Sequence, residues 1–174
     1  AAKKGFSVIA TANTRDKGVN EMSAALKRRF NIVVLPAPDD LDSEMEIVRT
    51  RVTQLSENLD LNAKQPADDV VEKVCTIFRE LRCGETLDRT QKVKGTSGVL
   101  STAEAISLLC NSMALAGSFG NGTVANEDLA AALQGAVIKD EDKDAVAWKE
   151  YLENVMKKRG SEWLGLYKAC KELV

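Results

Sequence analysis

The feature that most constrains this chain is a succession of helix starts, apolar stripes and helix stops between residues 39 and 174. Ser43–Glu46 and Ser101–Glu104 each have the spacing of a capping box, in which the serine hydroxyl and the glutamate carboxylate both accept a backbone N–H. Apolar residues follow each box at steps of three and four, which places them on one face of a helix. The pattern therefore predicts an all-helical domain over residues 39–174.

Other turn and capping residues divide this region into further helices. We expect a loop or small hairpin over residues 83–100, where glycines and polar residues replace the apolar stripe. The remaining helix boundaries are expected at start and stop residues: Pro66, Gly117, Asn126, Gly160 and Ser161.

The first 38 residues have a different pattern. Residues 6–12 and 31–36 are short apolar runs rich in β-branched residues, and a helical stretch over residues 21–30 lies between them. Strand, helix and strand in this order are typical of a crossover in a parallel sheet. Two strands do not make a stable sheet. The predicted fold class is therefore mostly α, with residues 1–38 as the remnant of a parallel α/β core and residues 39–174 as a helical domain with a C-terminal helical extension.

The composition excludes several kinds of site. The chain has no histidine, which rules out Ser/His/Asp and Cys/His catalysis and histidine-ligated metals. No two cysteines form a CxxC pair, so a zinc ribbon is excluded, and the thiols are expected to be small, reduced core residues in a cytoplasmic protein. No apolar run approaches the roughly 20 residues of a membrane helix. The four cysteines are Cys75, Cys83, Cys110 and Cys170.

Charge is unevenly distributed along the chain. The formal net charge is −2, which argues against a general nucleic-acid binder. Residues 1–38, however, hold seven Lys/Arg against two Asp/Glu, whereas residues 39–174 hold seventeen against twenty-four. We expect the basic N-terminal segment to face phosphates and the acidic helical region to face solvent or partners.

The chemistry is concentrated in the basic segment. Asn13 follows the first predicted strand, at the end where open α/β sheets bind ligands, and Arg28 and Arg29 come just before the second. An amide can orient a water molecule, and a guanidinium can neutralise charge on transferring oxygens. The arrangement therefore suits a phosphate site, although Asn13 read alone is also typical of a turn and Arg28 and Arg29 of a solvated helix end.

These segments resemble the second half of an AAA+ ATPase module of the MoxR-like and dynein-related (midasin-type) subgroup, which has a P-loop NTPase core and a helical lid. Ala10–Thr14 is similar to the sensor 1 strand, and Glu21–Phe30, in which an arginine directly precedes phenylalanine, is similar to the arginine-finger segment. Gly98–Thr102 resembles the start of the sensor 2 helix, and Val124–Leu133 resembles the lid segment that follows it.

The resemblance implies roles for particular residues. Asn13 would be the sensor 1 residue that holds the attacking water. Arg29 would be the arginine finger that reaches the ATP site of a neighbouring subunit, with Arg28 as the second candidate. Ser101 and Thr102 would contact the cofactor at the start of the sensor 2 helix. ATP and Mg²⁺ are the implied cofactors, with most of their ligands outside this chain.

The resemblance also implies a biological setting. The parent protein would hydrolyse ATP in a ring of its own subunits, expected to be a hexamer, and would remodel a partner as a chaperone does or help to insert a metal cofactor. A protein with a von Willebrand A-type domain is the implied client. Neither a membrane nor a nucleic acid is an expected partner.

Three features depart from the family pattern. The chain contains no GxxxxGK[ST] phosphate loop and no strand ending in Asp-Glu; we expect both upstream, and we expect the isolated chain not to hydrolyse ATP. Ala103 and Glu104 stand where the family has the sensor 2 arginine. Residues beyond about 140 exceed what the lid requires.

Two other interpretations remain open from the sequence. The chain could be a helical protein-interaction module without a nucleotide role, which the absence of both motifs upstream would favour. It could also be a DNA-binding helical regulator, which a steep salt dependence of duplex binding would favour.

Overall fold

A computed structural model describes residues 3–11, 23–35 and 38–174. The chain divides into two compact units, Ala1–Leu35 and Pro36–Val174, which are described separately below. The assignment of residues 1–38 to an α/β core and of residues 39–174 to a lid stays a prediction.

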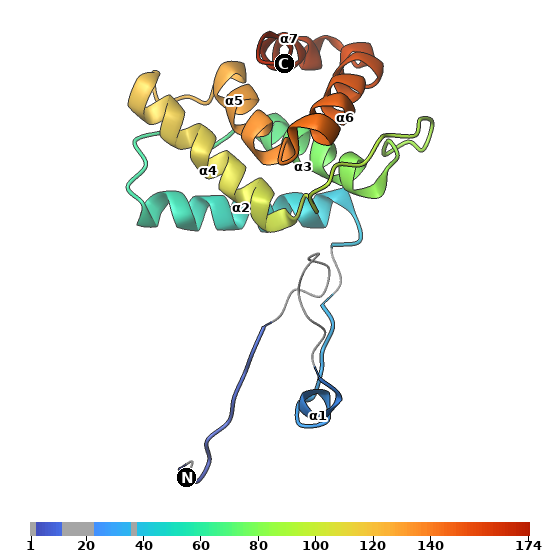
Figure 1. Ribbon diagram of the computed structural model, residues 1–174. Helices are drawn as coiled ribbons and strands as arrows, with labels where there is room; N and C mark the ends of the chain where they lie inside the picture. Colours follow the sequence, from blue (N-terminus) through green and yellow to red (C-terminus); the bar gives the residue numbers. More distant parts are fainter. Residues whose placement is uncertain (1–2, 12–22, 36–37) are drawn as a thin grey trace. The chain divides into compact units, whose positions relative to one another are not determined.

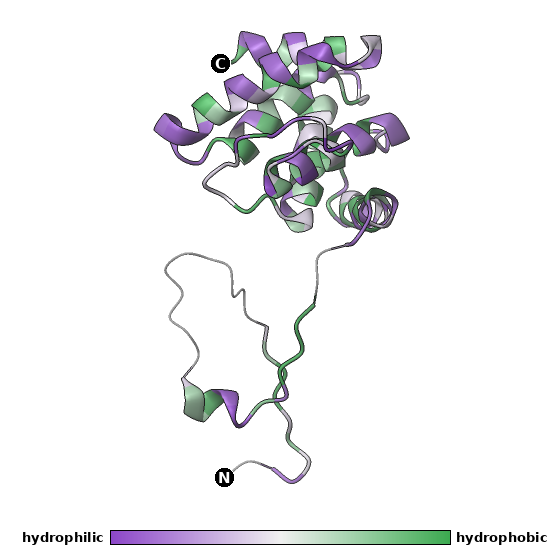
Figure 2. Ribbon diagram, turned by 90° about the vertical axis from the view of Figure 1, so that its right-hand side faces the viewer, coloured by the Kyte–Doolittle hydropathy of each residue, from purple (hydrophilic) through white to green (hydrophobic). Residues whose placement is uncertain are grey.

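The second unit consists of helices packed around one apolar core, and no β-strand occurs in its described residues, so the predicted mostly helical fold class is confirmed (Figure 1). Figure 2 shows hydrophilic residues on the outer faces of these helices, as the stripe pattern requires. The helices are α2 (Leu41–Asn58), α3 (Asp68–Cys83), α4 (Thr102–Phe119), α5 (Asn126–Val137), α6 (Glu141–Asn154), the 3₁₀ turn η1 (Met156–Lys158) and α7 (Ser161–Glu172).

Helix α2 begins three residues earlier than its predicted capping box. Asp40 is the N-cap, and its carboxylate accepts the Ser43 N–H at 2.7 Å, so the expectation that Ser43 caps this helix was wrong. Aspartate is as good an N-cap as serine, and the helix begins after the earlier of these two residues. As a consequence Glu44 lies inside the helix, on the same buried face as Val48 and Val52.

The predicted start of α4 is confirmed. Ser101 accepts the Glu104 N–H, and the Glu104 carboxylate accepts the Ser101 N–H at 2.8 Å, which completes a capping box. The start of α5 differs from the prediction, because Asn126 is its first helical residue and Asp128 supplies the carboxylate, which accepts the Ala125 N–H at 2.9 Å.

Helices α3 and α4 form the centre of this unit. Nine of the sixteen residues of α3 are buried, while α4 packs against α2, α3 and α5. Aromatic residues of the later helices belong to the same core: the rings of Trp148 and Tyr151 in α6 stack with centroids 5.7 Å apart, and Trp163 of α7 is also buried. Residues beyond 140 are thus part of the same core as the helices that precede them.

The segment between α3 and α4 is a small hairpin, as predicted, with an antiparallel bridge between Glu85 and Lys92. Its later part is held by the buried carboxylate of Asp144 in α6, which accepts the Ser97 N–H and hydroxyl, each at 2.7 Å. Burial alone would raise the pKa of Asp144, but hydrogen bonds from Ser97 and from the Asp140 and Lys139 backbones outweigh it and lower this pKa to about 2.

In the first unit, the described residues contain one short helix, α1 (Ala24–Lys27), within the predicted helical stretch. The predicted strands are not formed in their described parts, residues 6–11 and 31–35. A strand requires a neighbour for its backbone hydrogen bonds, and neither segment pairs with another described residue in that way. Their apolar side chains are exposed, with Ile9 at 95% and Leu35 at 85% (Figure 2, green).

None of the helices in the described residues combines the length and the apolar character that a membrane crossing requires.

Gly117 in α4 allows a close approach that a larger residue would prevent. A Cβ atom at this position would lie 2.6 Å from the carbonyl oxygen of Asn62, a backbone atom that cannot rotate away. We expect Gly117→Ala to reduce the free energy of unfolding by about 1–3 kcal/mol. Gly135→Ala in α5 is the matched control, because a Cβ there meets nothing within 4 Å and alanine favours a helix by about 0.5–1 kcal/mol. Urea unfolding of both variants measures the difference, and equal effects would contradict the steric argument.

Candidate functional site

The two candidate finger residues lie at the end of α1. Ser23 caps this helix by accepting the Leu26 N–H at 3.3 Å, and the backbone N–H of Arg28 and of Arg29 donate to carbonyls within the same turn. Both arginine side chains are exposed, and Phe30 behind them is half-buried. The negative end of a helix favours nearby cations, which is consistent with a basic pair at this position.

Arg28 and Arg29 differ from the other described arginines because neither side chain has a partner among the residues that the structure describes. Neither forms an ion pair or a side-chain hydrogen bond with any described residue. Every arginine of the helical unit does: Arg49 with Asp68, Arg51 with Gln54, Arg79 and Arg82 with Glu44, Arg89 with Glu85, and Arg159 with Glu80. The guanidinium groups at the end of α1 are therefore available to a group outside the described chain.

Asn13 lies outside the described residues, so the geometry between this amide and Arg29 is not part of the structure. Of the predicted site residues, the structure brings together Arg28 with Arg29 and, in the other unit, Ser101 with Thr102.

Ser101 and Thr102 lie at the start of α4, and both hydroxyls form hydrogen bonds within the fold. The Ser101 hydroxyl donates to the Glu104 carboxylate at 2.9 Å, and the Thr102 hydroxyl donates to Glu44 at 2.9 Å. The Ser101 contact caps α4, and the Thr102 contact attaches the start of α4 to α2. Their predicted contact with a cofactor stays a prediction.

The partner of Thr102 belongs to a buried ionic cluster, which we call the Glu44 cluster: Glu44, Arg79, Arg82 and Thr102. Glu44 is fully buried and accepts hydrogen bonds from Arg82 at 2.8 and 3.1 Å and from Arg79 at 3.2 Å. A buried carboxylate is stable only when opposite charges and donors surround it, and here three side chains provide them. The cluster joins α2, α3 and α4.

Arg79 and Arg82 also bind backbone carbonyls of the segments that precede α2 and α4. Arg79 donates to the carbonyls of Pro38 and Asp39, and Arg82 donates to the carbonyl of Leu100 at 2.8 Å. The segment that enters α2 and the segment that enters α4 are thereby attached to α3. The Glu44 cluster consequently sets where the helical unit begins.

The Glu44 cluster was not predicted from the sequence, because a glutamate near a helix start resembles a capping partner. One signal was present: Glu44, Val48 and Val52 are spaced by four, so the glutamate shares the apolar face of α2. Arg79 and Arg82 are three residues apart, which places both on one face of α3.

A second buried carboxylate, Glu80, connects α3 with the C-terminal helices. It accepts the Tyr151 hydroxyl at 2.6 Å and the Leu87 N–H at 2.9 Å, and it pairs with Arg159. Burial, followed by the charge of Glu80, raises the pKa of Tyr151 well above its usual value, so this phenol is a donor and not a proton shuttle at neutral pH.

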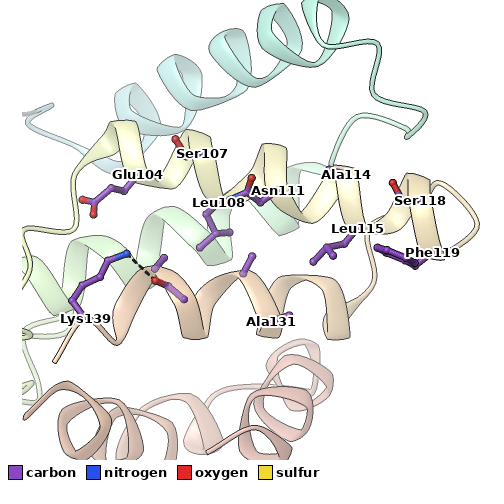
Figure 3. Close-up of a pocket in the computed structure, with 13 residues that line it drawn as sticks. Glu104, Ser107, Leu108, Asn111, Ala114, Leu115, Ser118, Phe119, Ala131 and Lys139 are labelled. Atoms are coloured by element: carbon purple, nitrogen blue, oxygen red, sulfur yellow. Dashed lines mark hydrogen bonds between the residues drawn. The ribbon is translucent and has the colours of Figure 1, made fainter. Parts of the chain in front are cut away.

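An open groove of about 570 Å³ runs between α4 and α5 (Figure 3). Most of its lining is apolar or small, with Glu104 and Lys139 together at one end and Phe119 at the other. The lining residues are Glu104, Ser107, Leu108, Asn111, Ala114, Leu115, Ser118, Phe119, Ala131, Ala132, Gly135, Ala136 and Lys139.

The thiols and carboxylates of the described residues do not form a metal centre: no group of three or more His, Cys, Asp or Glu side chains is placed to hold an ion there. All four cysteines are free. Burial raises the pKa of Cys75 and of Cys170 to about 12, so neither is a nucleophile at neutral pH. Cys83 at the end of α3 is exposed, and the expectation that it lies in the core was wrong.

The Glu44 cluster generates a stability prediction. We expect Glu44→Gln to lower the free energy of unfolding by about 3 kcal/mol, because the change leaves two half-buried guanidinium groups without a counter-charge. Glu46→Gln, which neutralises an exposed glutamate on the same helix, is the control and should change stability by less than about 0.5 kcal/mol. Chemical denaturation at neutral pH measures both, and a neutral outcome for Glu44→Gln would show that the cluster does not hold the three helices together.

Comparison with known proteins confirms the resemblance to dynein-related AAA+ ATPases that was drawn from the sequence. The model of the YehL-like AAA+ ATPase C-terminal domain matches residues 42–173, and that of the AAA domain (dynein-related subfamily) matches residues 1–30. "Uncharacterized protein YehL" of Escherichia coli (strain K12) is 34% identical over 173 residues, which are 99% of this chain and 47% of the relative, so the chain spans about half the length of the curated relative it matches. No solved structure matches the chain. Since the first of these models spans the whole set of helices from α2 to α7, the chain belongs to the family of YehL-like AAA+ ATPase C-terminal domains.

Proposed function

We propose that this chain forms the catalytic edge and the helical lid of a protein that hydrolyses ATP as a ring of identical subunits. Residues 1–38 would complete the α/β core and present Arg29 to the nucleotide of a neighbouring subunit, while the helices from α2 onward form the lid. Membership of an AAA+ ATPase family supports the ATPase class. The assembly into a ring, the number of subunits in that ring and the catalytic roles of individual residues are what we propose beyond the family membership.

The observation that carries the proposal is the contrast between arginines that have a partner in the described part of the chain and arginines that have none there. In the helical unit the arginines are used within the chain, three of them against fully buried carboxylates. Arg28 and Arg29 instead project from the end of α1 without a described partner. A guanidinium that acts on the phosphate oxygens of a nucleotide in another subunit cannot be engaged by a carboxylate of its own chain, because that carboxylate would compete with the phosphate.

The exposed apolar side chains of residues 6–11 and 31–35 provide further support. Phe6, Ile9, Val33, Val34 and Leu35 are each more than 65% exposed. Central strands of parallel sheets carry apolar side chains on both faces, since helices cover the sheet from both sides. We infer that other strands and helices of an α/β core cover these two segments.

The described residues do not by themselves fit a site for ATP and Mg²⁺. The chain has no phosphate loop, and the parts of it that the structure describes contain no cluster of carboxylates for the metal. The proposal therefore places the phosphate and Mg²⁺ ligands outside this chain. Asn13 would orient the attacking water. Ser101 and Thr102, at the start of α4, would contact the nucleotide.

The remaining parts of the proposal follow from the family resemblance. They are a hexameric ring in the cytoplasm, a chaperone-like action on a client or the insertion of a metal cofactor, and a client with a von Willebrand A-type domain.

Arg29→Ala tests the proposed role in a protein that contains this chain together with its phosphate-binding half. We expect kcat for ATP hydrolysis to fall by at least about a thousandfold, the lower range for an arginine finger, while the Kd for ATP stays unchanged. The finger serves a neighbour's nucleotide and so acts on charge that develops during the reaction. Steady-state rates and equilibrium titration with a fluorescent nucleotide provide the two numbers.

The matched control is Arg28→Ala, which removes an equivalent charge one residue earlier and is expected to have the smaller effect. A larger effect at this position would move the finger role to Arg28. Parallel losses of rate and affinity in Arg29→Ala would show that the residue binds nucleotide within its own subunit. Adding a hydrolysis-defective subunit that retains Arg29 should restore turnover to Arg29→Ala subunits if the residue acts in trans.

A further inference from the structure

The Glu44 carboxylate uses all of its acceptor positions. Its Oε1 atom accepts the Thr102 hydroxyl at 2.9 Å and Arg82 at 3.1 Å, and its Oε2 atom accepts Arg82 at 2.8 Å and Arg79 at 3.2 Å. A carboxylate has about four lone-pair positions, so four donors saturate it. Because the group is fully buried, a donor that moves away leaves an unsatisfied acceptor, which is costly. The positions of the three donating side chains are therefore tied to one another.

Arg79 connects this carboxylate with the chain that enters the helical unit. The same guanidinium donates to the carbonyl of Pro38 at 3.1 Å and to the carbonyl of Asp39. The side chain is only 17% exposed, so these contacts are largely shielded from water. A guanidinium presents five N–H donors in a fixed planar fork, which allows one side chain to bind three acceptors at once. A shift of the entering chain at Pro38 or Asp39 would therefore displace Arg79 from Glu44.

The other side of the cluster fixes the start of α4. Thr102 is the first residue of α4 and donates to the cluster's carboxylate, and Arg82 donates to the carbonyl of Leu100 just before it. The preceding segment is fixed as well, because the N–H and the hydroxyl of Ser97 donate to the buried carboxylate of Asp144. The start of α4 is thus attached to α2, α3 and α6, and it has little freedom to shift on its own.

Stability alone does not account for a cluster of this kind. Replacing a buried ion pair by apolar residues of similar volume is often neutral or stabilising. The best-attested use of buried charges is to select one arrangement of the chain over others. The arrangement selected here relates two segments that are far apart in the sequence, the entry of the chain into the helical unit and the start of α4.

We propose that Arg79 is a positioning residue for nucleotide binding: through Glu44 it sets where the start of α4 lies relative to the chain that enters the helical unit. This inference rests on the proposed function, in which Ser101 and Thr102 contact the nucleotide. A start of α4 that is already in place binds the nucleotide without a further ordering cost. Arg79 does not touch the nucleotide, and its effect passes through Glu44 and Thr102.

Arg79→Lys tests the inference in a protein that contains this chain together with its phosphate-binding half. Lysine keeps the charge beside Glu44 but lacks the planar fork, so it cannot bind the carboxylate and two carbonyls in the same geometry. We expect the Kd for ATP to rise about tenfold, while kcat at saturating ATP changes by less than about twofold. Loss of an interaction made equally in the ground state and the transition state gives this pattern. Equilibrium titration with a fluorescent nucleotide and steady-state rates measure the two quantities.

Arg49→Lys is the matched control, because Arg49 is an exposed arginine of α2 whose ion pair with Asp68 lies outside the cluster. It should change neither quantity. A purely structural role for Arg79 would lower the fraction of folded protein and leave the Kd of the folded molecules unaltered. An unchanged Kd in Arg79→Lys would therefore overturn the inference, as would a fall in kcat with the Kd preserved. The second pattern is the one expected of Arg29→Ala, so the two roles are judged separately.

A spin label on the entering chain tests the contacts of Arg79 without any nucleotide. In this chain with Cys83→Ser, which removes the exposed native thiol, the label is attached to Asp39→Cys, since the exposed Asp39 side chain can be replaced while its backbone carbonyl stays available to Arg79. We expect Arg79→Lys to shift the paramagnetic resonance spectrum toward a more mobile label and Arg49→Lys to leave it unchanged. Circular dichroism establishes that each variant is folded. An unchanged spectrum in folded Arg79→Lys would overturn the inference whether or not the protein hydrolyses ATP.

Discussion

The arrangement of the helical unit depends on one buried carboxylate and the two guanidinium groups that neutralise it. Glu44 is removed from water at the start of α2, and Arg79 and Arg82 of α3 surround it together with the hydroxyl of Thr102 at the start of α4. The desolvation of such an ion is unfavourable, and only this set of partners offsets it. The geometry of the three helices is therefore more restricted than apolar packing alone would make it.

Two other carboxylates extend this arrangement toward the C-terminus. Glu80 joins α3 to Tyr151 and Arg159, and Asp144 holds the end of the hairpin segment through Ser97. Each links segments that are far apart in the sequence. The C-terminal helices are for this reason joined to the earlier helices of the same unit by buried polar contacts as well as by the shared apolar core.

The distribution of charge differs between the two units. In the helical unit the arginines have partners in the chain, and the groove between α4 and α5 is lined by two charged side chains, Glu104 and Lys139. In the first unit Arg28 and Arg29 have no described partner. Charge that is neutralised internally positions helices, and charge that is left free can act on another molecule. This contrast supports the proposed division into a lid and a catalytic edge.

The sequence by itself determined the helical class, the capping box at Ser101, the hairpin before α4 and the AAA+ resemblance, because these depend on local hydrogen bonds and on spacing along one chain. It did not determine the start of α2, where Asp40 and Ser43 are both good caps, or the absence of strands at residues 6–11 and 31–35, since a strand depends on a neighbour. The Glu44 cluster and the close approach of Gly117 to Asn62 were decided only by tertiary structure. Each results from groups that are distant in sequence and become neighbours when the helices pack, and no local pattern specifies which charge will meet which.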